Sequence, residues 1–170
     1  MCEEDDIGVL TIDHINGNGG EHRRQIFGKR KGAGGGCSFY RWLKNNNYPE
    51  GYQVLCFSCQ FRKRSGEMKS DNPTHRQQVT ANYARKIKIE CLEHYGGCDC
   101  PCGETDIRTL TLDHVNNDGA EHRRKTNTRG YTFYHMLRKN GFPNDPPLQV
   151  RCLNCQIKKR NKLYYEQRKM

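Results

Sequence analysis

Two cysteine pairs in this sequence have a spacing suited to binding a metal ion. Cys56 with Cys59, and Cys152 with Cys155, are C-x-x-C pairs. This spacing lets two thiolates reach one ion while the backbone between them turns back, and four such ligands complete a tetrahedral structural zinc site. The pairs stand at matching places in the chain, which favours metal ligands over buried apolar thiols. The sequence therefore predicts structural Zn2+.

The remaining zinc ligands must come from cysteines further upstream. Cys98, Cys100 and Cys102 precede the second pair, and we favour Cys98 and Cys102, with Cys100 as the alternative. Only Cys2 stands at the matching place before the first pair. A fourth ligand is missing there unless Cys37, or a residue upstream of the given start, supplies it. We expect the first site to be incomplete.

An Asp-His dipeptide occurs twice, as Asp13-His14 and Asp113-His114, each at the end of a predicted strand. An imidazole can take a proton from water, and a carboxylate can hold Mg2+ or Mn2+ against a phosphate. Together these groups are the minimum set for phosphodiester hydrolysis. The four residues are therefore the candidate catalytic residues.

Further histidines and basic residues follow each dipeptide. His22 and His122 have two open interpretations, a hydrogen bond that braces the loop or a contact to phosphate or metal. The neighbouring basic positions are predicted to contact nucleic-acid phosphates. These positions are Arg23, Arg24, Arg123, Arg124, Lys63, Arg64, Lys158, Lys159 and Arg160.

The candidate residues recur because the chain contains an internal duplication. "LTIDHINGNGGEHRR" returns as "LTLDHVNNDGAEHRR", and "QVLCFSCQFRKR" returns as "QVRCLNCQIKKR". The matching segments are 10–24 with 110–124, 39–49 with 133–143, and 53–64 with 149–160. We predict a first module at 1–64, a polar linker at 65–78 and a second module at 79–170. The first module looks N-terminally truncated, because the chain starts one residue before Cys2, which aligns with Cys102.

The expected fold is small α+β and stapled by zinc, with two ββα modules and additional helices. The predicted elements are strands at 9–13 and 109–113, a Gly/Asn-rich loop after each, helices at 39–43 and 133–137, and basic closing helices from Gln60 and Gln156. A leading helix from Val79 to the Gly96-Gly97 stop precedes the second module only. The aromatic residues Tyr40, Trp42, Phe133 and Tyr134 are expected to fill the small cores.

Composition narrows the class of protein. The formal net charge is +10 and only 34% of residues are hydrophobic. The charge predicts attraction to a polyanion, most commonly nucleic acid. No apolar run approaches the roughly 20 residues of a membrane span, which predicts a soluble protein without a membrane partner. The C-x-x-C spacing favours reduced, metal-bound thiolates over disulfides, and the sequence has no apolar N-terminal signal stretch. Both features predict a reducing, intracellular setting.

The order of these motifs resembles that of phage-type HNH endonucleases, the ββα-metal or His-Me finger superfamily. Short members of that family run a zinc knuckle, "DH", "G..HR", "FY..L....P" and "LC.NCN..K". The resemblance covers nearly all of residues 79–160 and most of residues 2–64.

This resemblance implies a DNA endonuclease, with DNA favoured over RNA, of the homing or phage type. His14 and His114 would be general bases, Asp13 and Asp113 ligands of catalytic Mg2+ or Mn2+, and the closing helices backbone binders. Each module would nick one strand, so that a monomeric chain acts like a dimer. The same resemblance favours the cytoplasm or a virus as the source, with an organelle still open.

The sequence departs from the family pattern after each second knuckle cysteine. Gln60 and Gln156 stand where such enzymes carry the Asn or His metal ligand. Either the amide still reaches the ion, or His22 and His122 hold it, or the scaffold now only binds. The alternative hypothesis is therefore a catalytically inactive, HNH-derived nucleic-acid-binding protein, such as a structural ribonucleoprotein component. A zinc-stapled protein-interaction module is a third hypothesis, and it leaves the doubled Asp-His unexplained.

Overall fold

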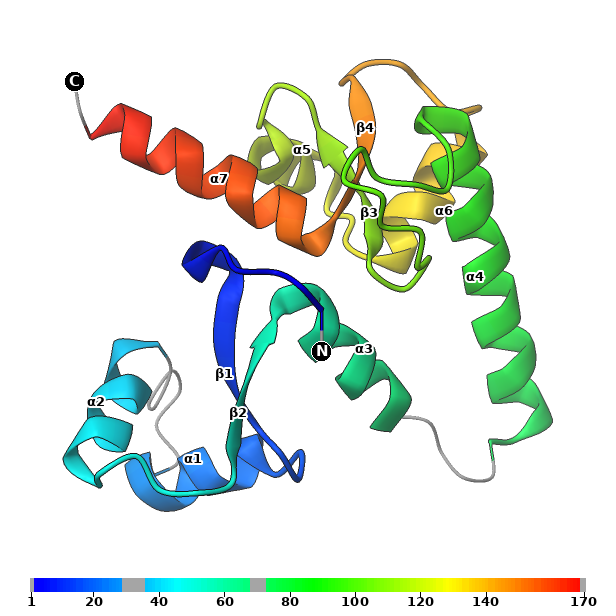
Figure 1. Ribbon diagram of the computed structural model, residues 1–170. Coiled ribbons are helices and arrows are strands. Elements are labelled where there is room, and N and C mark those ends of the chain that lie inside the picture. Colours follow the sequence, from blue (N-terminus) through cyan, green and yellow to red (C-terminus); the bar gives the residue numbers. More distant parts are fainter. Residues whose placement is uncertain (1, 29–35, 68–72, 169–170) are drawn as a thin grey trace. The chain divides into compact units, whose positions relative to one another are not determined.

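The computed structural model describes residues 2–28, 36–67 and 73–168. The chain divides into two compact units, residues 1–67 and 68–170. Both are α+β, and each holds one small antiparallel sheet of two strands (Figure 1). The predicted linker is shorter than 65–78, because helix α3 continues to Glu67 and helix α4 begins at His75. Residues 68–72 lie outside the described part of the chain.

The two units repeat one order of elements, and the second adds a leading helix. The first unit contains η1 Ile7–Val9, β1 Leu10–His14, α1 Gly19–Phe27, α2 Cys37–Asn45, β2 Tyr52–Cys56 and α3 Phe57–Glu67. The second contains α4 His75–Tyr95, β3 Leu110–His114, α5 Gly119–Thr126, α6 Tyr131–Lys139, β4 Leu148–Cys152 and α7 Leu153–Gln167.

The strands place the Asp-His dipeptides at one end of each hairpin. Strand β3 has the period-two burial of a half-buried strand, with Leu110, Leu112 and His114 turned to the core. It pairs with β4 so that Asp113 lies opposite Gln149, and β1 pairs with β2 in the same register. The dipeptide is therefore the last pair of residues on its strand. Each strand ends at the histidine, one residue later than predicted.

Helices α1 and α5 lie where the sequence predicted loops. Glycine costs about 1 kcal/mol relative to alanine inside a helix, so the pair Gly19-Gly20 favoured a loop. Helix α1 nevertheless begins at Gly19, and α5 begins at Gly119. Tertiary contact overrides the local preference, because α1 and α5 carry His22 and His122 against the buried histidines of β1 and β3.

The leading helix α4 contributes three completely buried residues to the second unit's core. A capping box between Thr74 and Gln77 starts it, so it begins earlier than the predicted Val79. Ile87, Cys91 and Leu92 are completely buried against α6 and the β3–β4 sheet. Along the described residues, no helix combines the length and apolar character needed to cross a membrane.

The first unit has a smaller core, because the residues described there include no helix in the place of α4. Its buried apolar residues are Val9, Phe39, Leu43 and Cys56. Tyr40 remains 46% exposed, so the expectation that it fills the core is wrong. Its equivalent in the second unit, Tyr134, is half-buried, because α4 covers it and Cys91 of α4 contacts its carbonyl.

Candidate metal centres and buried histidine pairs

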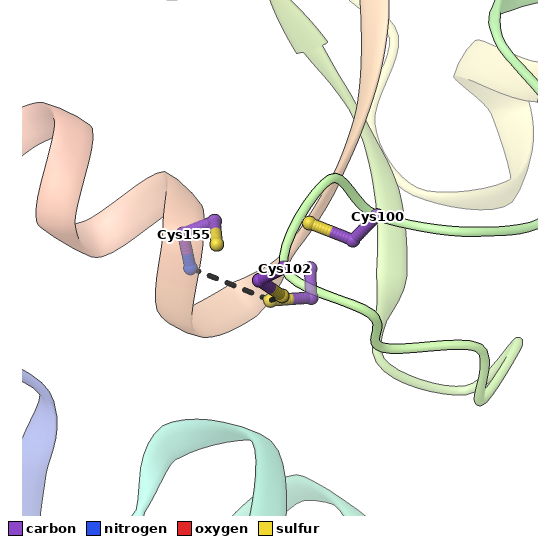
Figure 2. Close-up of side chains that lie close together, drawn as sticks. Cys100, Cys102 and Cys155 are labelled. Carbon is purple, nitrogen blue, oxygen red and sulfur yellow. Dashed lines mark hydrogen bonds between the residues drawn. The ribbon is translucent and has the colours of Figure 1, made fainter.

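Four cysteines of the second unit form a group that could hold a metal ion such as zinc. They are Cys100, Cys102, Cys152 and Cys155, whose sulfur atoms all lie within 4.8 Å of one another. Figure 2 shows the sulfurs of Cys100, Cys102 and Cys155 turned toward a common space. A tetrahedral ion with Zn–S bonds of about 2.3 Å sets its sulfurs about 3.8 Å apart. The Cys102 and Cys152 sulfurs are 3.6 Å apart, so the donor set fits zinc.

The structure selects Cys100 rather than Cys98, which corrects the preference drawn from spacing alone. A tight turn closes after Cys100, where the Gly103 N–H donates to the Cys100 carbonyl at 2.8 Å. Gly103 has a φ of 87°, a left-handed conformation that favours glycine. The turn brings the Cys100 and Cys102 sulfurs to one side, whereas Cys98 packs against the hydrophobic core outside the group.

The C-x-x-C pair of this group sits at a strand-to-helix junction. Cys152 ends β4, and its sulfur accepts the N–H of Cys155 at 3.4 Å as the N-cap of α7. Burial raises the pKa of the Cys152 thiol to about 11 and also raises the pKa of Cys155. Because a metal ion binds thiolates, its uptake here must release protons and strengthen as pH rises.

The first unit brings together three cysteines in the same frame. Cys2, Cys56 and Cys59 form the group that the described residues show, and the Cys2 and Cys56 sulfurs are 3.3 Å apart. Burial raises the pKa of Cys59 to about 11. Cys37, considered as the fourth ligand, is exposed at the start of α2 and is not a member of the group.

A buried pair of histidines lies in each unit at the end of the first strand. His14 Nε2 lies 2.9 Å from His22 Nδ1, and His114 Nε2 lies 2.7 Å from His122 Nδ1. His14 and His114 are only 8% and 7% exposed, and their partners are half-buried. Each pair therefore links the helix after the strand to the strand end by a hydrogen bond, and a contact of His22 and His122 to phosphate or metal stays a prediction.

Two neighbours hold each buried imidazole in place. The His14 ring stacks on Phe39 with ring centroids 5.4 Å apart, and His114 stacks on Phe133 at 5.9 Å. On the other side, a Cβ atom on Gly19 would lie 2.7 Å from His14 Nδ1. The same contact at Gly119 would be 2.9 Å. Sequence reasoning missed these glycines, although both copies carry one five residues after the histidine.

The environment keeps the buried imidazoles neutral. Burial is the main cause that lowers the pKa of His14 and of His114 below 6.5. The neighbouring histidine of each pair lowers it further, because two positive charges at this distance repel. At neutral pH the imidazoles of His14 and His114 are therefore uncharged.

In the first unit a lysine forms an ion pair with the Asp13 carboxylate. Lys63 Nζ lies 2.7 Å from Asp13 Oδ2 and also donates to the carbonyls of His14 and Ile15. Gln53 Nε2 donates to the same oxygen at 3.0 Å. Burial by itself raises the pKa of Asp13, but the hydrogen bonds from Lys63 and its neighbours outweigh it and lower the pKa.

The second unit repeats this ion pair. Lys159 Nζ lies 2.6 Å from Asp113 Oδ2, Gln149 Nε2 lies 2.9 Å from it, and Arg151 Nε lies 3.7 Å away. Lys63 and Lys159 were predicted to contact phosphate. In the structure both ammonium groups form an ion pair with a carboxylate of their own chain, and the phosphate contact stays a prediction.

Gln60 and Gln156, which follow the second cysteine of each C-x-x-C pair, have different partners. Gln60 Nε2 donates to Asp13 Oδ1 at 3.4 Å. Gln156 Nε2 instead donates to Thr111 Oγ1 and to the Leu112 carbonyl. Among the described residues, groups of three or more candidate ligands occur only at the two cysteine groups. As arranged, the Asp13 carboxylate with its lysine does not fit a divalent cation.

The predicted phosphate-binding arginines lie on helices rather than loops. Arg23 and Arg24 are exposed on α1, and Arg123 and Arg124 are exposed on α5, each one turn or less beyond the paired histidine. On the closing helices Arg64 and Arg160 are exposed, whereas Lys158 is half-buried. Two exposed arginines therefore follow each paired histidine directly on its helix.

Each unit thus combines a cysteine group, a buried histidine pair and a Lys–Asp ion pair on one strand–helix frame. No family model, curated protein or solved structure matches this chain.

Proposed function

We propose that this protein is a nucleic-acid phosphodiesterase of the HNH type that cuts DNA. The observation that supports this most is the buried histidine pair, which recurs at the end of the first strand in both units. A neutral imidazole beside exposed arginines is the arrangement that deprotonating a water next to a phosphate requires.

The two histidines of a pair act together in this proposal. His14 has one nitrogen on His22 and the other against Gly19, so a water reaches it poorly. His22 is the more exposed member. As the water oxygen attacks phosphorus, its proton passes to His22 Nε2 and the bond from phosphorus to the leaving oxygen breaks. The leaving oxygen then takes this proton back from His22, whose Nδ1–H stays hydrogen-bonded to His14 Nε2 throughout. His14 Nε2 thus sets the His22 tautomer that presents Nε2 as the acceptor, and Phe39 keeps the His14 ring aligned.

A catalytic cation has no place in these steps. The Lys63–Asp13 and Lys159–Asp113 pairs already neutralise the carboxylates that Mg2+ or Mn2+ would need. Cation binding would first require the lysine to leave, so metal dependence is a separate question for experiment. Structural Zn2+ on Cys100, Cys102, Cys152 and Cys155 is part of the proposal, because units this small gain folding energy from such a staple.

A specific observation also favours the second hypothesis, a nucleic-acid-binding protein without catalysis. The Gln156 amide donates to Thr111 and to the Leu112 carbonyl. In the second unit it is therefore not directed at the Asp113 carboxylate, where a metal ligand of the HNH type would point. The net charge of +10 and the exposed arginines serve binding equally well. The two hypotheses separate at the histidine pair, which a binder does not need.

The test is cleavage of supercoiled plasmid by zinc-loaded protein with Mg2+, with Mn2+ or with EDTA. The His14→Ala/His114→Ala double variant is compared with wild type, and affinity for a DNA duplex is measured by fluorescence anisotropy. Under the nuclease proposal, nicking disappears in the variant while affinity stays within about twofold, since a general base acts on the barrier. A wild type that binds DNA but never nicks it supports the binder.

A further inference from the structure

One face of the second unit is covered by α4, and the contacts are specific. Figure 1 shows α4 lying along α6 and the β3–β4 sheet. The helix presents Ile87, Cys91 and Leu92 to this face, all completely buried. Its polar contacts are Glu90 with Arg138 at 2.9 Å, Tyr95 with the Pro143 carbonyl at 2.8 Å, and Cys91 with the Tyr134 carbonyl at 3.5 Å.

The residues that receive α4 recur in the first unit through the duplication. Tyr134, Arg138, Phe142, Pro143 and Val150 correspond to Tyr40, Lys44, Tyr48, Pro49 and Val54. The backbone is repeated as well, because Tyr48 and Phe142 both adopt a positive φ, 50° and 57°. The receiving surface is therefore present twice, and among the described residues a helix covers it once.

The uncovered copy of this surface exposes apolar side chains. Val54 is 49% exposed whereas Val150 is 5% exposed, and Tyr48 is 71% exposed whereas Phe142 stacks on His94. A groove of about 580 Å³ opens beside them, lined in part by Ile12, Tyr40 and Leu43. We call this surface, made of Ile12, Tyr40, Lys44, Tyr48 and Val54, the open face.

We propose that the open face binds an amphipathic α-helix of a partner protein that presents an apolar stripe and a carboxylate in the arrangement of α4. The positive charge of Lys44 on the open face is the reason for expecting a carboxylate on the partner's helix. Lys44 stands where Arg138 receives Glu90, so a helix bearing Glu or Asp at that position matches it in charge. The groove takes the apolar residues on either side of the acid, as Ile87 and Cys91 flank Glu90.

The occupant is a partner's helix rather than the α4 of a second copy. In each chain α4 already buries its apolar stripe in its own second unit. Moving it to another chain would expose that core, so the exchange gains no apolar burial. The inference does not depend on the proposed nuclease activity, because the open face shares no residue with the histidine pair.

The probe for the experiment is a fluorescent peptide of residues 74–97, the sequence of α4 with its cap and its glycine stop, added to the full zinc-loaded chain. We expect saturable binding of one peptide per chain in fluorescence anisotropy. Lys44→Glu should weaken binding about three- to tenfold, and a Glu90→Lys peptide should restore it on that variant. Val54→Asp should weaken binding by at least about tenfold, because it buries a charge.

These variants keep the test clear of folding artefacts. Lys44 and Val54 are exposed, so the changes leave the unit folded, which circular dichroism checks. Absence of saturable binding overturns the proposal, and so does equal binding to all variants, since the peptide would then be entering the second unit. A chain that dimerises in ultracentrifugation, with Val54→Asp abolishing the dimer, would assign the face to a second copy instead.

Discussion

The Nζ atom of Lys159 lies 2.6 Å from Asp113 Oδ2 and 2.6 Å from the His114 carbonyl oxygen. Lys63 makes the same contacts to Asp13 and His14 in the first unit. In each unit, one ammonium group therefore ties the closing helix to the end of the first strand. Lys63 and Lys159, which the sequence predicted to contact nucleic acid, therefore have a structural role.

Replacing this lysine should destabilise the unit without a specific loss of DNA binding. Lys159→Met keeps the aliphatic length but takes the ammonium from the half-buried Asp113 carboxylate and the donor from the carbonyls of His114 and Val115. We expect the free energy of unfolding to fall by about 1–3 kcal/mol. Urea unfolding followed by circular dichroism measures this.

The matched control is Arg160→Met, the next residue on the same helix, which is exposed. This change should leave the unfolding free energy within about 0.5 kcal/mol and weaken DNA affinity in anisotropy. The opposite pattern, with stability intact and binding lost only in Lys159→Met, would return Lys159 to the phosphate contacts.

The glycine against the buried imidazole gives a second matched pair. Gly19→Ala places a Cβ 2.7 Å from His14 Nδ1, whereas a Cβ on Gly20 meets nothing within 4 Å. Gly19→Ala should displace His14 and lower the unfolding free energy by about 1–3 kcal/mol. Gly20→Ala should raise it by up to about 1 kcal/mol, because alanine is the better helix former.

Unfolding titrations of both variants measure these effects, and the second unit already carries Ala120 at the position of Gly20. If the nuclease proposal holds, Gly19→Ala also slows nicking by the first unit. Equal stability of the two variants would mean that the imidazole moves aside without cost, and the role given to Gly19 would be wrong.

The duplication and the alternation of strand residues made the sheets and the outer helices predictable from the sequence. The Asp-His positions, the C-x-x-C pairs and the leading helix follow from local patterns. Helices α1 and α5 do not, because Gly19-Gly20 argues against a helix and the contact of His22 with His14 that fixes it is tertiary. The ion pair of Lys63 was not predictable for the same reason, since nothing local shows that its ammonium group contacts Asp13.

The prediction that Tyr40 is buried was wrong for a further reason. Its helical spacing with Leu43 predicts burial in both copies, and in the second copy Tyr134 is indeed covered by α4. A pattern within α2 cannot reveal whether another element covers that face. The choice of Cys100 over Cys98 likewise depends on a turn at Gly103 that spacing does not specify.

The cysteine group gives a third prediction, on metal content. Cys100→Ser should reduce the zinc bound by the second unit and unfold it, because a structural metal supplies folding energy. Cys98→Ser, two residues away and outside the group, should retain zinc and most of the stability. Zinc per chain is measured by plasma mass spectrometry, and folding by circular dichroism. Loss of zinc in Cys98→Ser with retention in Cys100→Ser would reverse the ligand assignment.

The buried histidines give a fourth prediction, on pH. Burial lowers the pKa of His14 and His114 in the folded chain below the ordinary 6.5, so the unfolded chain takes up these protons first as pH falls. Their contribution to stability is therefore complete above pH 6.5 and is lost as pH falls from there through the folded pKa. Histidine Cε1–H resonances in an NMR titration report the folded values directly.

Protonation of zinc-bound thiolates also destabilises the chain in acid, so a control is needed to separate the two causes. The His14→Gln/His114→Gln variant keeps an amide donor but cannot titrate. Its unfolding free energy should fall less steeply than that of wild type below pH 6.5, by the part that the two imidazoles contribute. Parallel curves for the two proteins would place the whole acid effect on the cysteines. Midpoints at or above 6.5 for His14 and His114 would show that burial does not lower their pKa in the folded chain.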